Sequence, residues 1–327
     1  MKRSALLLGV IAFAMFTTTL TAQNGGMNIG RLQANESLQV GTASESVVVQ
    51  SDLVALPPLT NSEILRIVDP AEGSIVYATD SDILLVFDGE KWRRADGQND
   101  SYLIIPVPCG APFIDSRDGT SYNTVEIGTQ CWMAENLKYL PSVVGPATGS
   151  ETAGSETTSY YYVYGYDGIV VAEAKATSNY ATYGVLYNWP AAMDGSASSE
   201  ANPSGVQGAC PDGWHLPSDA EWTVLTDLLG GLNYSGGKMK EQETVHWKSP
   251  NTGATNESGF TGLPGGYRNY LNGSFSIVGY SGYWWSAMEV SGQYAWPRCL
   301  SSDNALVSRS SYKKSNGFSV RCLRDSD

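Results

Sequence analysis

Charged residues and histidine are scarce in this chain of 327 residues. Charged side chains make up 16% of the sequence, where an ordinary soluble domain has about 25%. The 20 lysines and arginines are outnumbered by 33 aspartates and glutamates, which gives a formal net charge of −13 at pH 7. Binding to nucleic acid or another polyanion through bulk charge is therefore disfavoured, because phosphate neutralisation requires clustered lysine and arginine. With only 2 histidines, metal centres built from histidine and most histidine-based catalytic triads are disfavoured too.

The apolar run at the start of the chain, residues 5–16, is too short to cross a membrane, since a spanning helix needs about 20 apolar residues. Lys2 and Arg3 precede this run, and small residues ending in Ala22 follow it. This order is typical of a secretory signal peptide. We therefore predict a signal peptide over 1–22 with cleavage after Ala22, no membrane span, and a mature protein that is secreted or held in the cell envelope. No cysteine follows the apolar run, so a lipoprotein anchor is disfavoured.

Cysteine is sparse, and its spacing does not suit a metal site. The chain has five cysteines, namely Cys109, Cys131, Cys210, Cys299 and Cys322. No pair is spaced as CxxC, so a structural zinc site of the usual kind is disfavoured. Export permits disulfides, and an odd number leaves at least one thiol free or paired with another chain.

Glycine and aromatic residues, in contrast, are plentiful. There are 35 glycines, 19 tyrosines and 9 tryptophans, and 42% of the residues are hydrophobic, which excludes disorder throughout the chain. A weakly charged chain rich in glycine and tyrosine is typical of an extracellular β-rich protein.

The first region after the signal peptide, residues 23–100, is predicted to be a small β-rich N-terminal module. Apolar runs alternate with turn signals such as Asp88-Gly89, which predicts a small meander with strands at 74–78, 83–87 and 90–94. A module with so few large apolar side chains buries little surface alone. We therefore expect it to pack on the next domain or on copies of itself, which makes a homo-oligomer through this module one candidate assembly.

The second region, residues 113–327, follows a linker over 101–112 that contains Pro106 and Pro108. Its clearest helix is predicted over 218–229, where Ser218 and Glu221 form a capping box and two glycines end the helix. Most other segments are strand-like and separated by glycine. The fold class predicted for this region is α+β, a β-rich domain with one or two helices.

Six segments of the second region carry a family resemblance. They are GTQCWMAENL, YGVLYNW, CPDGWHLPSDAEW, GFTGLPGGYR, GYWWSA and NGFSVRCLRD, in this order. Their identity and order resemble the Fibrobacter succinogenes major paralogous domain, a family of secreted and surface proteins. That family resembles C-type-lectin-like domains and formylglycine-generating enzymes in fold, so the resemblance implies a C-type-lectin-like domain over 113–327. It implies no reaction, and the N-terminal module is similar to a short module that often precedes such domains.

The resemblance also bears on the disulfides. A bridge from the helix to the terminal strand is usual in C-type-lectin-like domains, which implies a Cys210–Cys322 pair. Cys109 and Cys131 flank the first strand of the domain and could form a second bridge. Cys299 would then be the unpaired cysteine, and a buried free thiol is the preferred interpretation over a link to another chain.

Nothing in the cysteine or histidine pattern indicates an enzyme. The formylglycine-generating oxidases use two cysteines a few residues apart, and this chain has no such pair. His215 is interpreted as a packed or hydrogen-bonded structural residue, and His246 as a surface residue. Spacing singles out no two of the many acidic residues as a pair for glycoside hydrolysis. We expect the chain not to be an enzyme.

Calcium is the one metal that the resemblance suggests. Sugar-binding C-type lectins hold calcium through Glu-Pro-Asn or Gln-Pro-Asp together with Trp-Asn-Asp. The nearest segments here are Ala201-Asn202-Pro203 and Ser302-Asp303-Asn304, and neither matches. No cofactor is expected, and calcium stays open as the alternative.

The best candidate for a binding surface is the C-terminal stretch 283–316, which is rich in tyrosine, tryptophan, arginine, serine and asparagine. These side chains give large contact area and adaptable hydrogen bonds, and aromatic faces also stack on sugar rings. At least one of Trp284 and Trp285 is expected in the core. The candidate ligand-facing residues are Tyr283, Tyr294, Trp296, Arg298, Asp303, Asn304, Ser308, Ser310 and Tyr312.

The sequence therefore predicts a non-enzymatic secreted or cell-surface protein that binds a glycan or a protein through its C-terminal aromatic face. The alternative is a structural subunit of the envelope or extracellular matrix without a discrete ligand.

Overall fold

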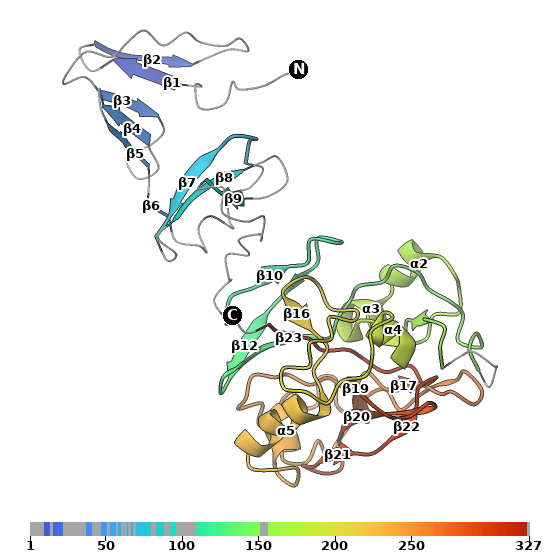
Figure 1. Cartoon of the computed structure of the whole chain (residues 1–327). Coiled ribbons are helices and arrows are strands. Elements are labelled where there is room, and N and C mark those ends of the chain that lie inside the picture. The colour runs from blue at the N-terminus through green and yellow to red at the C-terminus, as the bar shows by residue number, and fades with distance from the viewer. Residues whose placement is uncertain are drawn as a thin grey trace. The chain divides into compact units, whose positions relative to one another are not determined.

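The chain forms two compact units in the computed structural model, Met1–Pro108 and Cys109–Asp327 (Figure 1). The division falls inside the stretch 101–112 that the sequence assigns to a linker. The second unit is described almost throughout and the first only in part. The described residues are 10–13, 16–21, 37–40, 47–50, 53–56, 58–59, 64, 67, 70–79, 83–87, 92–95, 109–150 and 156–325.

The first unit is built from short strands. The bounds are β1 Val10–Phe13, β2 Phe16–Thr21, β3 Ser37–Val40, β4 Val47–Gln50, β5 Leu53–Ala55, β6 Pro58–Leu59, β7 Ile75–Ala78, β8 Ile83–Phe87 and β9 Trp92–Arg94. β1 pairs with β2, and β3, β4 and β5 form a second small sheet. The predicted signal peptide covers β1 and β2 and stays a prediction.

The predicted meander is confirmed in the third sheet of this unit, whose order is β6-β7-β8-β9. β7, β8 and β9 are antiparallel neighbours, and β6 adds a short parallel strand beside β7. Alternate residues of β7 and β8 point to one side, which buries Val76, Ala78 and Leu85 with Ile64 and Trp92. This core is small, as the composition predicts.

Two four-stranded sheets organise the second unit. The first has the order β12-β13-β23-β16, with β12 Thr124–Ile127, β13 Gln130–Met133, β16 Trp214–His215 and β23 Leu323–Arg324. The last strand of the chain thus lies between two earlier ones. The second sheet contains β19 Ser281–Ser291, β20 Tyr294–Ser301, β21 Val307–Arg309 and β22 Tyr312–Lys313, and both β21 and β22 pair with β20.

Three two-stranded ribbons complete the β structure of the described part of this unit. They are β10 Phe113–Ile114 with β11 Ser121–Tyr122, β14 Tyr161–Tyr162 with β15 Leu186–Tyr187, and β17 Tyr267–Arg268 with β18 Phe275–Ser276.

The described part of the second unit holds five helices, where the sequence predicts one or two. They are α2 Val171–Lys175, α3 Ser178–Tyr183, α4 Trp189–Met193, α5 Asp219–Leu228 and α6 Ser235–Met239. α5 is the predicted helix, and its capping box between Ser218 and Glu221 is confirmed. The other four span five or six residues each, which is too short for an apolar period to show. In the described ranges, no helix is long and apolar enough to span a bilayer.

Two hydrophobic clusters lie on opposite faces of the second sheet. One includes Ala295 and Cys299 of β20. The other includes Trp284 of β19 and Leu300 of β20, and α5 contributes Trp222 to it. Both Trp284 and Trp285 are fully buried, so the core takes both tryptophans of this pair.

Both expected disulfides are present. Cys109 is bonded to Cys131 across 22 residues and Cys210 to Cys322 across 112 residues. Cys299 is free and buried, which confirms the preferred interpretation of the unpaired cysteine. Burial raises the pKa of its thiol to about 12, so Cys299 is protonated and unreactive at neutral pH.

Candidate ligand-binding site

The alternation of side chains along β20 sets out the candidate site. Ala295 and Cys299 point into one hydrophobic cluster. Tyr294 and Trp296 therefore lie on the opposite face, two residues apart. Trp296 is half-buried and Tyr294 is 37% exposed. Toward the other end of β20 the same face is covered by α5, whose first residue, Asp219, contacts Arg298. The aromatic pair therefore lies beyond the N-terminal end of α5, where the sheet face becomes accessible.

Asp219, the first residue of α5, anchors the covered part of this face. Arg298 of β20 donates from Nη1 to Asp219 Oδ1 at 2.5 Å and from Nη2 to Thr223 Oγ1 at 3.2 Å. Burial of Asp219 opposes its ionisation, but hydrogen bonds and charge from Arg309 and Arg298 outweigh burial and lower the pKa of this carboxyl group. The carboxylate is thus held ionised between two guanidinium groups.

Cations cover both aromatic rings of this face. The Arg309 guanidinium lies 3.9 Å from the centre of the Trp296 ring, and its Nε and Nη2 contact the Asp219 carboxylate at 2.9–3.0 Å. Lys313 Nζ lies 4.7 Å from the centre of the Tyr294 ring. We call the four side chains Tyr294, Trp296, Arg309 and Lys313 the β20 face.

Two predicted ligand-facing residues are buried instead, so their assignment is corrected. Arg298 is 1% exposed and bound to Asp219. Tyr283 is 8% exposed and packs on Phe318 with ring centres 4.8 Å apart. Tyr312 is half-buried on the same side as Tyr283, away from the β20 face.

Asp303, Asn304, Ser308 and Ser310 do not join the β20 face as one set. Asp303 and Asn304 follow the far end of β20, about 20 Å along the strand from Tyr294. Ser308 pairs with Cys299 and so points to the other side of the sheet, although it is exposed. Ser310 is exposed in the link between β21 and β22 and directly follows Arg309 of the β20 face in the sequence.

The loop that carries Asn304 is held by a buried lysine. Lys240 Nζ donates to the backbone oxygens of Thr252, Ser301 and Asn304 at 2.8–2.9 Å. Burial lowers the pKa of this ammonium group to about 8. Lys240 therefore ties three backbone segments together and is a structural element of the loop.

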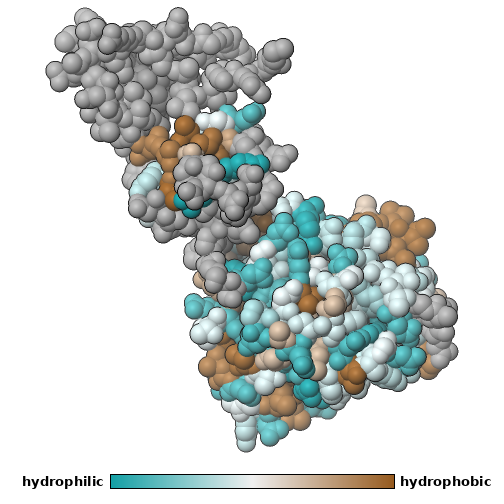
Figure 2. Space-filling view, viewed as in Figure 1, coloured by the Kyte–Doolittle hydropathy of each residue, from teal (hydrophilic) through white to brown (hydrophobic). Residues whose placement is uncertain are grey.

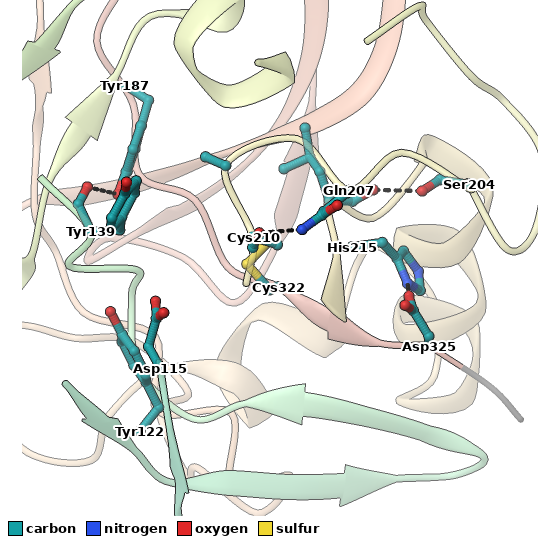
Figure 3. The surroundings of a disulfide bond; sticks show 12 residues. Asp115, Tyr122, Tyr139, Tyr187, Ser204, Gln207, Cys210, His215, Cys322 and Asp325 are labelled. Carbon is teal, nitrogen blue, oxygen red and sulfur yellow. Dashed lines mark hydrogen bonds and ion pairs between the residues drawn. A yellow bond between two sulfur atoms is a disulfide. The ribbon is translucent and has the colours of Figure 1, made fainter. Parts of the chain in front are cut away.

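A second polar site surrounds the Cys210–Cys322 disulfide (Figure 3). His215 is buried, with Nδ1 2.6 Å from Asp325 Oδ1 and Nε2 2.9 Å from Glu221 Oε1. The prediction that His215 is a hydrogen-bonded structural residue is confirmed. A pocket of about 300 Å³ adjoins this site, lined by Pro203, Gly205, Gln207, Asp212, Gly213, Trp214, His215 and Asp325.

The other histidine, His246, is predicted to be a surface residue and is partly exposed. The His246 side chain is 32% exposed, and its Nδ1 lies 2.8 Å from Glu241 Oε1.

Comparison with protein families identifies the second unit. The model of the Fibrobacter succinogenes major domain matches residues 125–324. The chain belongs to the Fibrobacter succinogenes major domain family. The match runs from β12 to β23 and includes the β20 face and His215. No curated protein and no solved structure matches this chain.

The Fibrobacter succinogenes major domain of this chain is expected to lose stability in alkaline solution through His215. Burial disfavours the imidazolium, but the hydrogen bonds that it donates to the Asp325 and Glu221 carboxylates outweigh burial and raise the pKa of His215 to about 9. Because this value exceeds the ordinary 6.5, the stabilisation is complete below pH 6.5 and is lost as the pH rises through 9. The expected loss is about 3 kcal/mol of unfolding free energy.

Urea unfolding of wild type and His215→Gln from pH 6 to pH 10 measures this loss. Lys240 titrates in the same range, so the quantity to compare is the difference between the two proteins at each pH. The difference should shrink as the pH rises. A constant difference would mean that His215 is neutral in the folded domain.

The described part of the chain shows no metal site. Across the described ranges, no group of three or more histidine, cysteine, aspartate or glutamate side chains is placed to hold an ion.

Proposed function

We propose that this chain is an exported, non-enzymatic protein that binds a glycan or a protein on the β20 face of a C-type-lectin-like domain. The observation that carries the proposal is the pair of ring–cation stacks, Trp296 with Arg309 and Tyr294 with Lys313, at the accessible end of β20. Aromatic and arginine side chains dominate the binding energy of most recognition surfaces.

Rigid support favours a binding role for this face. Arg309 is held by Asp219 on α5 as well as by the Trp296 ring, so the stack is formed before a ligand arrives. Side chains that are already ordered lose less conformational entropy on binding. A purely structural surface would not require this preorganisation at an accessible position.

The location and fold rest on further observations. Two disulfides fit an oxidising compartment, in agreement with the predicted signal peptide. The terminal strand β23 lies between β13 and β16, and the Cys210–Cys322 bridge joins the segment before α5 to the end of the chain. Both features support a C-type-lectin-like arrangement. The N-terminal unit would serve as a spacer or as an oligomerising module.

Binding of the full chain to glycan and protein arrays tests the proposal. We expect the double variant Tyr294→Ala, Trp296→Ala to bind at least tenfold more weakly than wild type, since truncation of central aromatic anchors has effects of this size. Tyr234→Ala is the matched control, because Tyr234 is 68% exposed and lies at the start of α6.

Two results would contradict the proposal. If wild type binds nothing on either array, a structural subunit without a discrete ligand becomes the better interpretation. If wild type and the folded double variant bind equally, the ligand is held by another surface. Thermal unfolding of each variant shows whether the domain is folded.

A further inference from the structure

The cations on the β20 face determine what a ligand meets first. One side of the Trp296 ring is covered by Arg309 and one side of the Tyr294 ring by Lys313. A neutral sugar that stacks on these rings would have to displace the cations or use only the opposite sides. A negatively charged ligand could instead bind the cations where they are.

Both cations keep donors for such a ligand. Arg309 uses Nε and Nη2 on Asp219, and within the described residues its Nη1 has no protein acceptor. Lys313 Nζ donates to Gln293 Oε1 at 2.7 Å and forms no salt bridge with a described carboxylate. Because an ammonium group has three donors, Lys313 retains capacity for a further acceptor.

The local charge has the opposite sign to the charge of the chain. At the β20 face three basic side chains, Arg298, Arg309 and Lys313, accompany a single carboxylate, that of Asp219. The neighbouring Lys314 is buried and paired with Glu289, so it adds no net charge. Asp219 neutralises only one of the two arginines that it contacts. The chain as a whole carries −13, but at physiological ionic strength charges beyond about 8 Å are largely screened. A small anionic ligand therefore encounters a cationic surface here.

We infer that the β20 face binds an acidic oligosaccharide, with a ligand carboxylate placed between Arg309 and Lys313. This inference rests on the proposed function and names the class of ligand. Trp296 and Tyr294, whose rings Arg309 and Lys313 cover, are two residues apart on β20, a backbone distance of about 7 Å. One acidic sugar can therefore reach both cations. Arginine pairs with carboxylates through its planar donors.

The surroundings favour a sugar over an acidic peptide. The exposed link between β21 and β22 offers the hydroxyls of Ser310 and Ser311, which suit sugar hydroxyls. Protein interfaces usually have an apolar centre, yet the most exposed aliphatic side chains, Ile169 at 76% and Val245 at 72%, lie outside the β20 face. Figure 2 shows separate apolar patches on a largely hydrophilic visible surface.

The test compares acidic oligosaccharides with their methyl esters, which keep the sugar and remove the charge. The probes are trimers of galacturonate, of glucuronate and of mannuronate, measured by calorimetry on the full chain. We expect at least one acid to bind at least tenfold more tightly than its ester. Lys313→Gln should weaken binding of that acid about fivefold and leave binding of the ester unchanged. Lys248→Gln, the same change at an exposed lysine outside the β20 face, should alter neither.

Each other outcome has a definite meaning. If an ester binds as tightly as its acid, the face recognises neutral sugars, so the inference is overturned while the proposed function stands. The same holds if none of the acids binds but the arrays yield a neutral glycan or a protein that requires Tyr294 and Trp296. If the arrays and the acids yield no ligand, both are overturned. Equal effects of Lys313→Gln on acid and ester would show a structural role for this lysine.

Discussion

Loss of the Cys210–Cys322 disulfide is expected to destabilise the C-terminal unit by about 4–5 kcal/mol of unfolding free energy. The bridge closes a loop of 112 residues, and in the chain-entropy model a longer loop gives a larger effect. Both cysteines are fully buried, so the double change to alanine also removes packing. Urea unfolding followed by tryptophan fluorescence measures the loss, because eight of the 9 tryptophans follow Cys109.

The second disulfide supplies the control for this prediction. Cys109–Cys131 closes a loop of 22 residues, for which the same model gives about 3 kcal/mol. Cys299→Ala changes a buried free thiol and should cost only about 1 kcal/mol. If removal of the short loop costs as much as removal of the long one, loop closure is not the main source of the stabilisation.

Local signals in the sequence predict part of the fold correctly. The capping box of Ser218 and Glu221 marks the start of α5, since each side chain bonds the backbone of the other residue. The alternating runs between turns give β7, β8 and β9. Both disulfides follow from the family resemblance and not from spacing alone.

The four short helices have no comparable signal. α4, for example, is capped by Asn188, whose side chain accepts a hydrogen bond from the Ala191 backbone, and it has Pro190 in its first turn. All five residues of α4 are buried, so no polar face reveals a helical period. Tertiary packing stabilises such a helix more than its own propensity does.

The candidate site shows the same limit at the level of single residues. The sequence selects Tyr294, Trp296 and Arg298 as ligand-facing by residue type, but residue type does not tell which of them a helix covers. Arg298 is buried because Asp219, 79 residues earlier, lies over it. The sequence analysis did not identify Lys313 as part of the site. Lys313 lies over the Tyr294 ring only because the two residues are paired in the register of β20 with β22. Long-range register is not encoded in a local pattern.

Asp219→Asn is expected to lower the free energy of unfolding by about 3–5 kcal/mol at pH 7, because it leaves a buried charge without its partner. The Arg298 side chain is 1% exposed and the Asp219 side chain 10% exposed. Asparagine keeps the size of the side chain and its position in the first turn of α5. The measured effect therefore reports the carboxylate charge and its hydrogen bonds to Arg298 and Arg309 more than packing. The same urea unfolding experiment gives the value.

The pH dependence separates this charge effect from a general defect. The pKa of Asp219 is lowered from its ordinary 3.8 in the folded domain, so its contribution is present above that value and is lost as the pH falls through the lower folded pKa. The difference between wild type and Asp219→Asn should thus be full at pH 7 and shrink below pH 3.8. Asp227→Asn changes an exposed carboxyl group on the same helix and should stay within about 0.5 kcal/mol of wild type. If both variants behave alike, the buried Asp219–Arg298 pair does not stabilise the junction of α5 with β20, and the support for Arg309 on the β20 face must come from the Trp296 ring alone.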